Sequence, residues 1–265
     1  MGKKRYIFFD IDGTLIPKGN YSAEVSESTR KAIERLKEAG HFLCLATGRA
    51  EVLAAPYREK LGFDNMISDG GYGLTLDGKL IGITPLPKDR IIRLVDECRE
   101  KNIPWGIQPD NTDTRSVPDE SFMAATHDTY MKTRIVPGLD PRNYDCIYKM
   151  YVACTPDEEK HMEALPALPH YRFRSEYLFV EPCDKGFGIK KVMDLFGADY
   201  KDAVVFGDEA NDFAMFRDEW TKVAMGNAIP ELKAMADYVT DRVENDGIYK
   251  ACEHLGLFEA VDSHL

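Results

Sequence analysis

The 265-residue chain lacks long apolar runs, repeats, excess positive charge and paired cysteines, and each absence excludes a class of function or location. It has no apolar run near the roughly 20 residues that cross a bilayer, so we expect no membrane partner. Its start, MGKKRYIFFD, is basic but reaches Asp10 after only a short apolar run. That run is too short for the apolar region of a signal peptide. The sequence also has no internal repeat and no low-complexity tract.

Excess positive charge and paired cysteines are also missing. The chain has 34 Lys and Arg against 45 Asp and Glu, a formal net charge of -11. This balance disfavours nucleic acid or an anionic membrane surface as a partner. An anionic substrate must therefore be attracted locally, by a metal ion or a few placed cations. The six cysteines show no C-x-x-C pair and no zinc-like spacing, so we expect a reducing, cytoplasmic location.

The composition that is present, 44% hydrophobic and 30% charged, is typical of a soluble globular protein. The length suits one large domain or two of moderate size. The first 70 residues alternate between strand and helix patterns, and the apolar run HFLCLA is typical of a parallel strand covered on both faces. The predicted elements are a strand at 5–10, a helix at 26–39, a strand at 41–46, a segment at 51–61 that Pro56 should kink or restart, and a strand at 65–68.

A change of pattern follows residue 83. Asp77-Gly78 between two alternating runs predicts a hairpin just before it. Beyond the change we expect a helix at 90–101, a helix within 120–132, and strands at 105–109, 146–154 and 177–182. Strand–helix alternation then returns, with a helix from Lys185, a strand at 203–208, a helix from 211, and strands at 222–226 and 237–240.

The simplest organisation is an α/β fold in two domains. A doubly wound, Rossmann-like parallel sheet would be built from residues 1–83 and 183–265. An inserted α+β cap domain at 84–182 would interrupt it.

Four polar clusters stand where an apolar strand gives way to a loop or helix. In a doubly wound sheet the carboxyl ends of the strands open onto one crevice, so these clusters should converge. Together they supply carboxylates, one lysine, hydroxyls and glycine-permitted N–H groups, which are the parts of a Mg²⁺ site beside a phosphate cradle. The clusters are Asp10-Ile11-Asp12-Gly13-Thr14, Thr47-Gly48-Arg49, Lys185-Gly186 and Gly207-Asp208-Glu209-Ala210-Asn211-Asp212.

Each cluster also has a purely structural interpretation. The Asp10–Asp12 pair alone fits a turn, although it lacks the further ligand spacing of a calcium loop. A lysine at the start of a helix is usually solvated, and Asp208 or Asn211 could cap the following helix. The argument for a site rests on the ordered set of four clusters.

That ordered set resembles the haloacid dehalogenase superfamily of phosphotransferases, in particular its Cof-type branch with a cap between the second and third motifs. The resemblance spans nearly the whole chain. It rests on FFDIDGT, ATGR, KGFGI, VVFGDEANDFAMF, MGNAIPELKAMADYVT and the NDG at 245–247.

The resemblance implies a role for each matching position. Asp10 would be the nucleophile that forms an aspartyl-phosphate, and Asp12 the general acid and then the base. Mg²⁺ would bind the carboxylates of Asp10 and Asp208 and the backbone carbonyl of Asp12, with Asp212 in supporting contact. The phosphate and substrate would be bound by Thr14, Thr47, Gly48, Lys185 and Asn211.

The implied activity is hydrolysis of a small phosphorylated metabolite, most simply a sugar phosphate. Two alternatives stay open: a phosphotransferase or phosphosugar mutase on the same scaffold, and a non-catalytic phosphometabolite-binding protein. Where the family usually has Asn-Gly-Ala, this chain has Asp69-Gly70-Gly71, so no contact is transferred there. The sequence indicates neither an oligomeric state nor a ranking of the cap candidates Trp105, Arg115 and Glu181.

Overall fold

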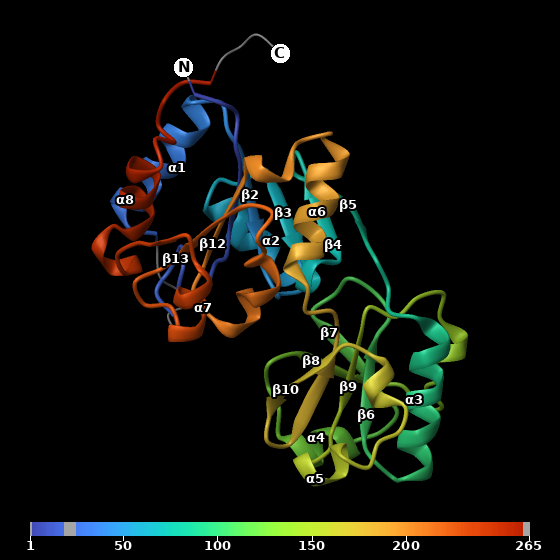
Figure 1. Ribbon diagram of the computed structural model, residues 1–265. Coiled ribbons are helices and arrows are strands. Elements are labelled where there is room, and N and C mark those ends of the chain that lie inside the picture. Colours follow the sequence, from blue (N-terminus) through green and yellow to red (C-terminus); the bar gives the residue numbers. More distant parts are fainter. Residues whose placement is uncertain (1, 19–24, 262–265) are drawn as a thin grey trace. The chain divides into compact units, whose positions relative to one another are not determined.

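The computed structural model describes residues 2–18 and 25–261, which pack as two compact units (Figure 1). Unit 1 consists of Met1–Arg49, Ala54–Gly82 and Asp184–Leu265, and unit 2 of Ala50–Leu53 and Ile83–Cys183. The two junctions near residues 83 and 183 lie one residue from the expected boundaries. A further difference concerns Ala50–Leu53, which group with unit 2 although the sequence pattern placed them in the core.

Unit 1 is built on an eight-stranded sheet of the doubly wound type. Its strands from β14 to β3 run parallel, and β4 runs antiparallel to β3. The chain builds outward from β1 in one direction and returns on the other side through β12, so the winding reverses between these two strands. The order across the sheet is β14 (Tyr238–Val239), β13 (Thr221–Ala224), β12 (Ala203–Gly207), β1 (Tyr6–Phe9), β2 (Phe42–Ala46), β3 (Asn65–Ser68), β4 (Gly73–Leu76) and β5 (Lys79–Ile83).

Helices cover both faces of this sheet, as the apolar strands require (Figure 1). Strand β1 alternates between the two cores: Ile7 and Phe9 point to one, Tyr6 and Phe8 to the other. The first core is closed by α1 (Glu27–Glu38), α2 (Glu51–Lys60) and α8 (Gly247–His254), and the second by α6 (Lys185–Leu195) and α7 (Pro230–Met235). The predicted α/β class and parallel core are therefore confirmed.

Local signals account for several element ends. Ser26 caps α1 by accepting from the Thr29 N–H, and the Asp77-Gly78 turn has φ of 47° and 75°, as a two-residue hairpin between β4 and β5 needs. Helix α2 runs without a break from Glu51 to Lys60, so Pro56 does not restart it. The helix expected after Asp208 is a 3-10 helix, Ala210–Met215.

Unit 2 has a six-stranded sheet whose neighbours are antiparallel except for β7 and β8. The order is β10 (His170–Arg174), β11 (Tyr177–Val180), β9 (Lys149–Val152), β6 (Trp105–Gln108), β7 (Thr114–Val117) and β8 (Lys132–Ile135), with helices α3 (Lys88–Glu100), α4 (Ser121–Thr126) and α5 (Pro156–Glu159).

The helix expected within 120–132 is shorter than predicted. It ends at Thr126, where His127 takes a left-handed conformation with φ of 48°. The chain then enters β8, which the sequence pattern did not indicate, and neither did it indicate β7.

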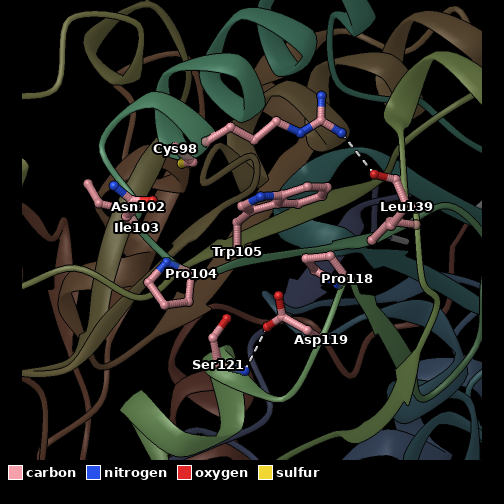
Figure 2. A pocket seen from close by; sticks show the side chains of 11 residues that line it. Cys98, Asn102, Ile103, Pro104, Trp105, Pro118, Asp119, Ser121 and Leu139 are labelled. Atoms are coloured by element: carbon pink, nitrogen blue, oxygen red, sulfur yellow. Dashed lines mark hydrogen bonds between the residues drawn. The ribbon is translucent and has the colours of Figure 1, made fainter.

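A cavity of about 480 Å³ opens on unit 2, at the carboxyl end of α3 (Figure 2). Figure 2 shows Trp105 in its wall, with Asp119 accepting a hydrogen bond from the Ser121 N–H nearby. Arg99 donates to the Leu139 carbonyl across it, at 2.9 Å. No helix among the described residues is both long and apolar enough to cross a membrane.

Candidate active site

The site begins where β1 ends. Asp10 follows the strand directly, is 4% exposed, and donates its N–H to the Phe206 carbonyl of β12. The chain then turns sharply, with the Gly13 N–H bonded to the Ile16 carbonyl at 2.7 Å. Gly13 has φ of 93°, and a Cβ there would lie 2.1 Å from a carboxylate oxygen of Asp208. Only glycine fits this approach, so the sequence Asp-Gly-Thr brings the loop against the end of β12.

Three carboxylates meet at this point. Asp10, Asp208 and Asp212 are buried, and each offers an oxygen within 4.8 Å of the others. Burial and the charge of Asp212 raise the pKa of Asp10 to about 8, and the same two causes raise that of Asp208 to about 6. The cluster therefore carries more negative charge than its own cations offset.

Lys185 is the cation that the protein itself places in the cluster. It opens α6, is 1% exposed, and donates to Asp10 at 2.5 Å and to Asp212 at 2.6 Å. Burial alone would lower the pKa of Lys185, but Asp10 and Asp212 outweigh it and hold the pKa above its usual value. The structural interpretation of Lys185 as a solvated residue is therefore wrong.

The start of α6 is fixed by the loop that follows β3. The Asp184 N–H donates to the Gly70 carbonyl at 2.8 Å, and a Cβ on Gly71 would lie 2.0 Å from the Asp184 carbonyl oxygen. Asp69, Gly70 and Gly71 all have positive φ. The Asp-Gly-Gly loop thus has a structural task, since its two glycines let the residue before Lys185 approach the loop closely.

Asp212 lies close enough to Asp10 and Asp208 to be a metal ligand, but its own hydrogen bonds hold neighbouring groups of the site in place. Its Oδ1 accepts from Lys185, and its Oδ2 accepts from the N–H groups of Asp208 and Glu209 at 2.8 and 3.1 Å. Because both oxygens are already engaged, its proximity to the other carboxylates carries less weight than these bonds. The supporting role that the resemblance implies for Asp212 stays a prediction, and these contacts are the kind that such a role needs.

The donors around the cluster differ in what they contact. Thr14 donates its hydroxyl to Asp208 at 3.2 Å, so the structure directs it to a carboxylate of the cluster. Thr47 is buried at the end of β2 and accepts from the Arg49 N–H. Among the described residues the N–H groups of Asp12 and Gly48 have no hydrogen-bond partner, and a Cβ on Gly48 would meet only open space. Asn211 is exposed, and within the described ranges its side chain makes no hydrogen bond.

Comparison with known proteins agrees with this geometry. The family model described as haloacid dehalogenase-like hydrolase matches residues 7–252. The chain belongs to this family. YkrA of Bacillus subtilis (strain 168), whose name marks it provisionally as a phosphatase, is 35% identical over 259 residues, covering 96% of this chain and 99% of YkrA.

Two solved structures extend the agreement to the whole fold. A protein from Geobacillus kaustophilus HTA426 matches with a TM-score of 0.80 and 30% identity, covering 96% of this chain and 99% of the other. The subclass IIB sugar phosphatase BT4131 matches with a TM-score of 0.71 and 26% identity, covering 96% and 100%. The resemblance stated from the motifs is thereby confirmed.

The contacts of two residues in this member of the family were missed by sequence reasoning. Asn227 donates to the Gly13 carbonyl at 2.7 Å and accepts from the Val243 N–H at 3.0 Å, so it braces the turn after Asp12. The segment MGNA that holds it was noted, but only as part of the resemblance. Arg49 forms an ion pair with Asp12 at 2.8 Å, which the ATGR motif did not indicate.

The three unranked residues of unit 2 have distinct environments. Trp105 lines the cavity of Figure 2. Arg115 is fully buried, pairs with Asp128 at 2.8 Å, and lies over the Phe122 ring. Glu181 is buried against Lys149 and accepts from Tyr171 at 2.5 Å. Arg115 therefore belongs to the interior of unit 2.

Proposed function

We propose that the protein is a Mg²⁺-dependent phosphatase that hydrolyses the monoester of a small phosphorylated metabolite through an aspartyl-phosphate. The observation that carries this proposal is the buried contact of Asp10 with Lys185, beside Asp208. A carboxylate at the end of the central strand, held by a lysine and flanked by two more carboxylates, suits nucleophilic attack better than mere binding.

Asp10 would attack the phosphorus with the carboxylate oxygen that Lys185 does not hold. Its Oδ1 accepts from Lys185 at 2.5 Å, which fixes the direction of the other oxygen. The ionised form is needed for attack, and Lys185 works against the burial that disfavours it. The N–H groups of Asp12 and Gly48, with Thr47 and Lys185, are the proposed ligands of the phosphoryl oxygens.

Asp12 would transfer protons in both halves of the reaction. In the first half it protonates the oxygen of the leaving group. In the second it removes a proton from the water that attacks the aspartyl-phosphate. Its side chain is 30% exposed, so it can exchange protons with solvent between turnovers.

The donor set fits Mg²⁺, which takes hard oxygen ligands and binds through one or two carboxylates. Asp10 and Asp208 would hold it with the Asp12 backbone carbonyl, and Asp212 and Thr14 would orient the Asp208 segment. The raised pKa values of Asp10 and Asp208 are those of carboxylates that a cation would return to the ionised form. When bound, Mg²⁺ would supply positive charge to the phosphoryl oxygens.

The proposed substrate class is a sugar phosphate. Support comes from the sugar phosphatase BT4131, which aligns over nearly the whole of both chains. We assign substrate selection to the inserted domain at 84–182 and chemistry to the clusters of unit 1. The transferase alternative has the same site, and only the final acceptor, water or a second sugar hydroxyl, separates the two.

The experiment is a phosphate-release screen with Mg²⁺ over sugar phosphates, nucleotides, pyridoxal phosphate and an aryl phosphate. We expect inorganic phosphate from the aryl ester and from at least one sugar phosphate, with loss of activity in EDTA and recovery with Mg²⁺. Asp10→Asn should be inactive on every substrate. Turnover that persists in EDTA or in Asp10→Asn would overturn the proposal, and an isomeric sugar phosphate without release of phosphate would favour the transferase.

A further inference from the structure

The carboxylate of Asp12 is gripped by one side chain. Arg49 donates from Nε to Oδ2 of Asp12 at 3.0 Å and from Nη2 to Oδ1 at 2.8 Å. Each oxygen thus receives its own N–H, which is the geometry that fixes a carboxylate plane most firmly. Across residues 2–18 and 25–261, these two bonds are all the hydrogen bonds that the Asp12 carboxylate receives from other side chains.

Arg49 is itself held in place from several directions. Its N–H donates to the Thr47 hydroxyl at 3.2 Å, and its carbonyl accepts from the Asp69 N–H at 2.8 Å. Its guanidinium carbon lies 4.3 Å from the centre of the Tyr57 ring on α2, a cation–π distance. Strand β2, the loop after β3 and helix α2 therefore all contribute to the position of the Arg49 fork.

An exposed carboxylate needs such a support if it is to transfer protons. The Asp12 side chain is 30% exposed, and among the described residues its carboxylate is oriented by the two hydrogen bonds from Arg49. Proton transfer needs the carboxyl within about 3 Å of the leaving oxygen, and a misplacement of 1 Å can cost about 100-fold in rate.

We propose that Arg49 is a positioning residue that holds Asp12 for proton transfer to the leaving group. This inference rests on the proposed function, because it needs Asp12 as the acid. In the step concerned, the bond between Asp10 and phosphorus forms and the bond to the leaving oxygen breaks. The proton passes from Asp12 to that oxygen. Arg49 moves no proton and acts only through the direction of the Asp12 carboxyl.

Comparing substrates with different leaving groups tests the positioning role, because a merely structural role would affect alkyl and aryl esters equally. An alkoxide needs protonation as it leaves, whereas a nitrophenolate hardly does. The ratio kcat/KM covers only the steps up to loss of the leaving group, so it isolates this requirement from the later hydrolysis. Removing the support of Asp12 should therefore lower kcat/KM far more for an alkyl ester than for an aryl ester.

The experiment compares Arg49→Met with the wild type on p-nitrophenyl phosphate and on the best sugar phosphate from the screen. We expect kcat/KM to fall at least tenfold more on the sugar phosphate. Arg49→Lys keeps the charge but loses the two-pronged hydrogen bonding, so its selective loss of kcat/KM should lie between those of the wild type and Arg49→Met. Arg142→Met is the matched control, because it removes an exposed pair of two hydrogen bonds with Asp96, at 2.6 and 3.3 Å. It should leave kcat/KM unchanged on both substrates.

Asp12→Asn separates failure of this inference from failure of the proposed function. If Asp12→Asn loses kcat/KM equally on both esters, Asp12 is not the acid and the proposed role falls. If Asp12→Asn discriminates between the esters but Arg49→Met does not, the positioning role of Arg49 alone is wrong. In the Asp12→Asn background, Arg49→Met should leave the alkyl-to-aryl ratio unchanged, because its effect passes through Asp12.

Discussion

Replacing Lys185 by methionine should destabilise the metal-free protein more than any surface charge change. The Lys185 ammonium is buried and lies 2.5 Å from Asp10 and 2.6 Å from Asp212. Loss of one partner from a buried ion pair costs about 3–5 kcal/mol, because the remaining charge is left without compensation. At about 2–4 °C per kcal/mol for a chain of this size, the Tm in EDTA should fall by roughly 6–20 °C.

The assay is thermal denaturation at pH 8, in EDTA and in Mg²⁺. Lys250→Met is the control, because Lys250 pairs at 2.6 Å with Asp241, both side chains are about half exposed, and such surface pairs contribute less than about 1 kcal/mol. Mg²⁺ should raise the Tm of Lys185→Met by more than it raises that of the wild type, since the metal then offsets the whole cluster. Equal losses in the two variants, or a loss that Mg²⁺ does not reduce, would refute the reasoning.

Three further outcomes follow from the same contacts. Asp10→Asn should abolish phosphate release while the Tm in EDTA stays at or above the wild-type value, because one repelling charge is gone; measurable turnover would contradict the nucleophile assignment. The pKa of Asp10, about 8 against an ordinary 3.8, means that the folded state holds its proton more tightly, so stability in EDTA is lost as the pH rises through this interval. Between pH 6 and 8 the wild type should lose about 1–3 kcal/mol more than Asp10→Asn, and equal slopes in the two would count against the raised pKa. Arg115→Met should cost about 3–5 kcal/mol by removing the buried partner of Asp128, which among the described residues keeps only a longer ion pair of 3.9 Å to Arg174. It should leave kcat on an aryl phosphate unchanged; a loss of that kcat would place Arg115 in the chemistry.

Much of unit 1 could be predicted because its signals are local. The apolar runs of β1 and β2 are buried on both faces, Ser26 caps α1, and Asp77-Gly78 turns the hairpin. The strand ends could be predicted in the same way, because in a parallel sheet they share one edge. That argument led to Asp10, Asp208 and Lys185 as one cluster, and the structure places them together.

What the sequence missed depends on contacts between distant segments. The fork of Arg49 on Asp12 spans 37 positions, and Asn227 reaches Gly13 across 214. The local sequence around Arg49 or Asn227 does not predict which distant residue each will contact. In unit 2, β7 and β8 are short strands that pair with each other, and β7 buries Arg115 against Asp128 of the loop before β8. The apolar periodicity that identifies strands is therefore weak there.

The central claim is a covalent aspartyl-phosphate on Asp10 whose formation and hydrolysis both use Asp12. Rapid-quench kinetics of Asp12→Asn test it most directly, because the backbone carbonyl at position 12 survives the substitution. With an aryl phosphate and Mg²⁺ we expect a burst of about one phenolate per enzyme, then very slow turnover as the phosphorylated enzyme accumulates. With a sugar phosphate we expect no burst. Smooth turnover of the aryl ester near the wild-type rate, without a burst, would contradict the account.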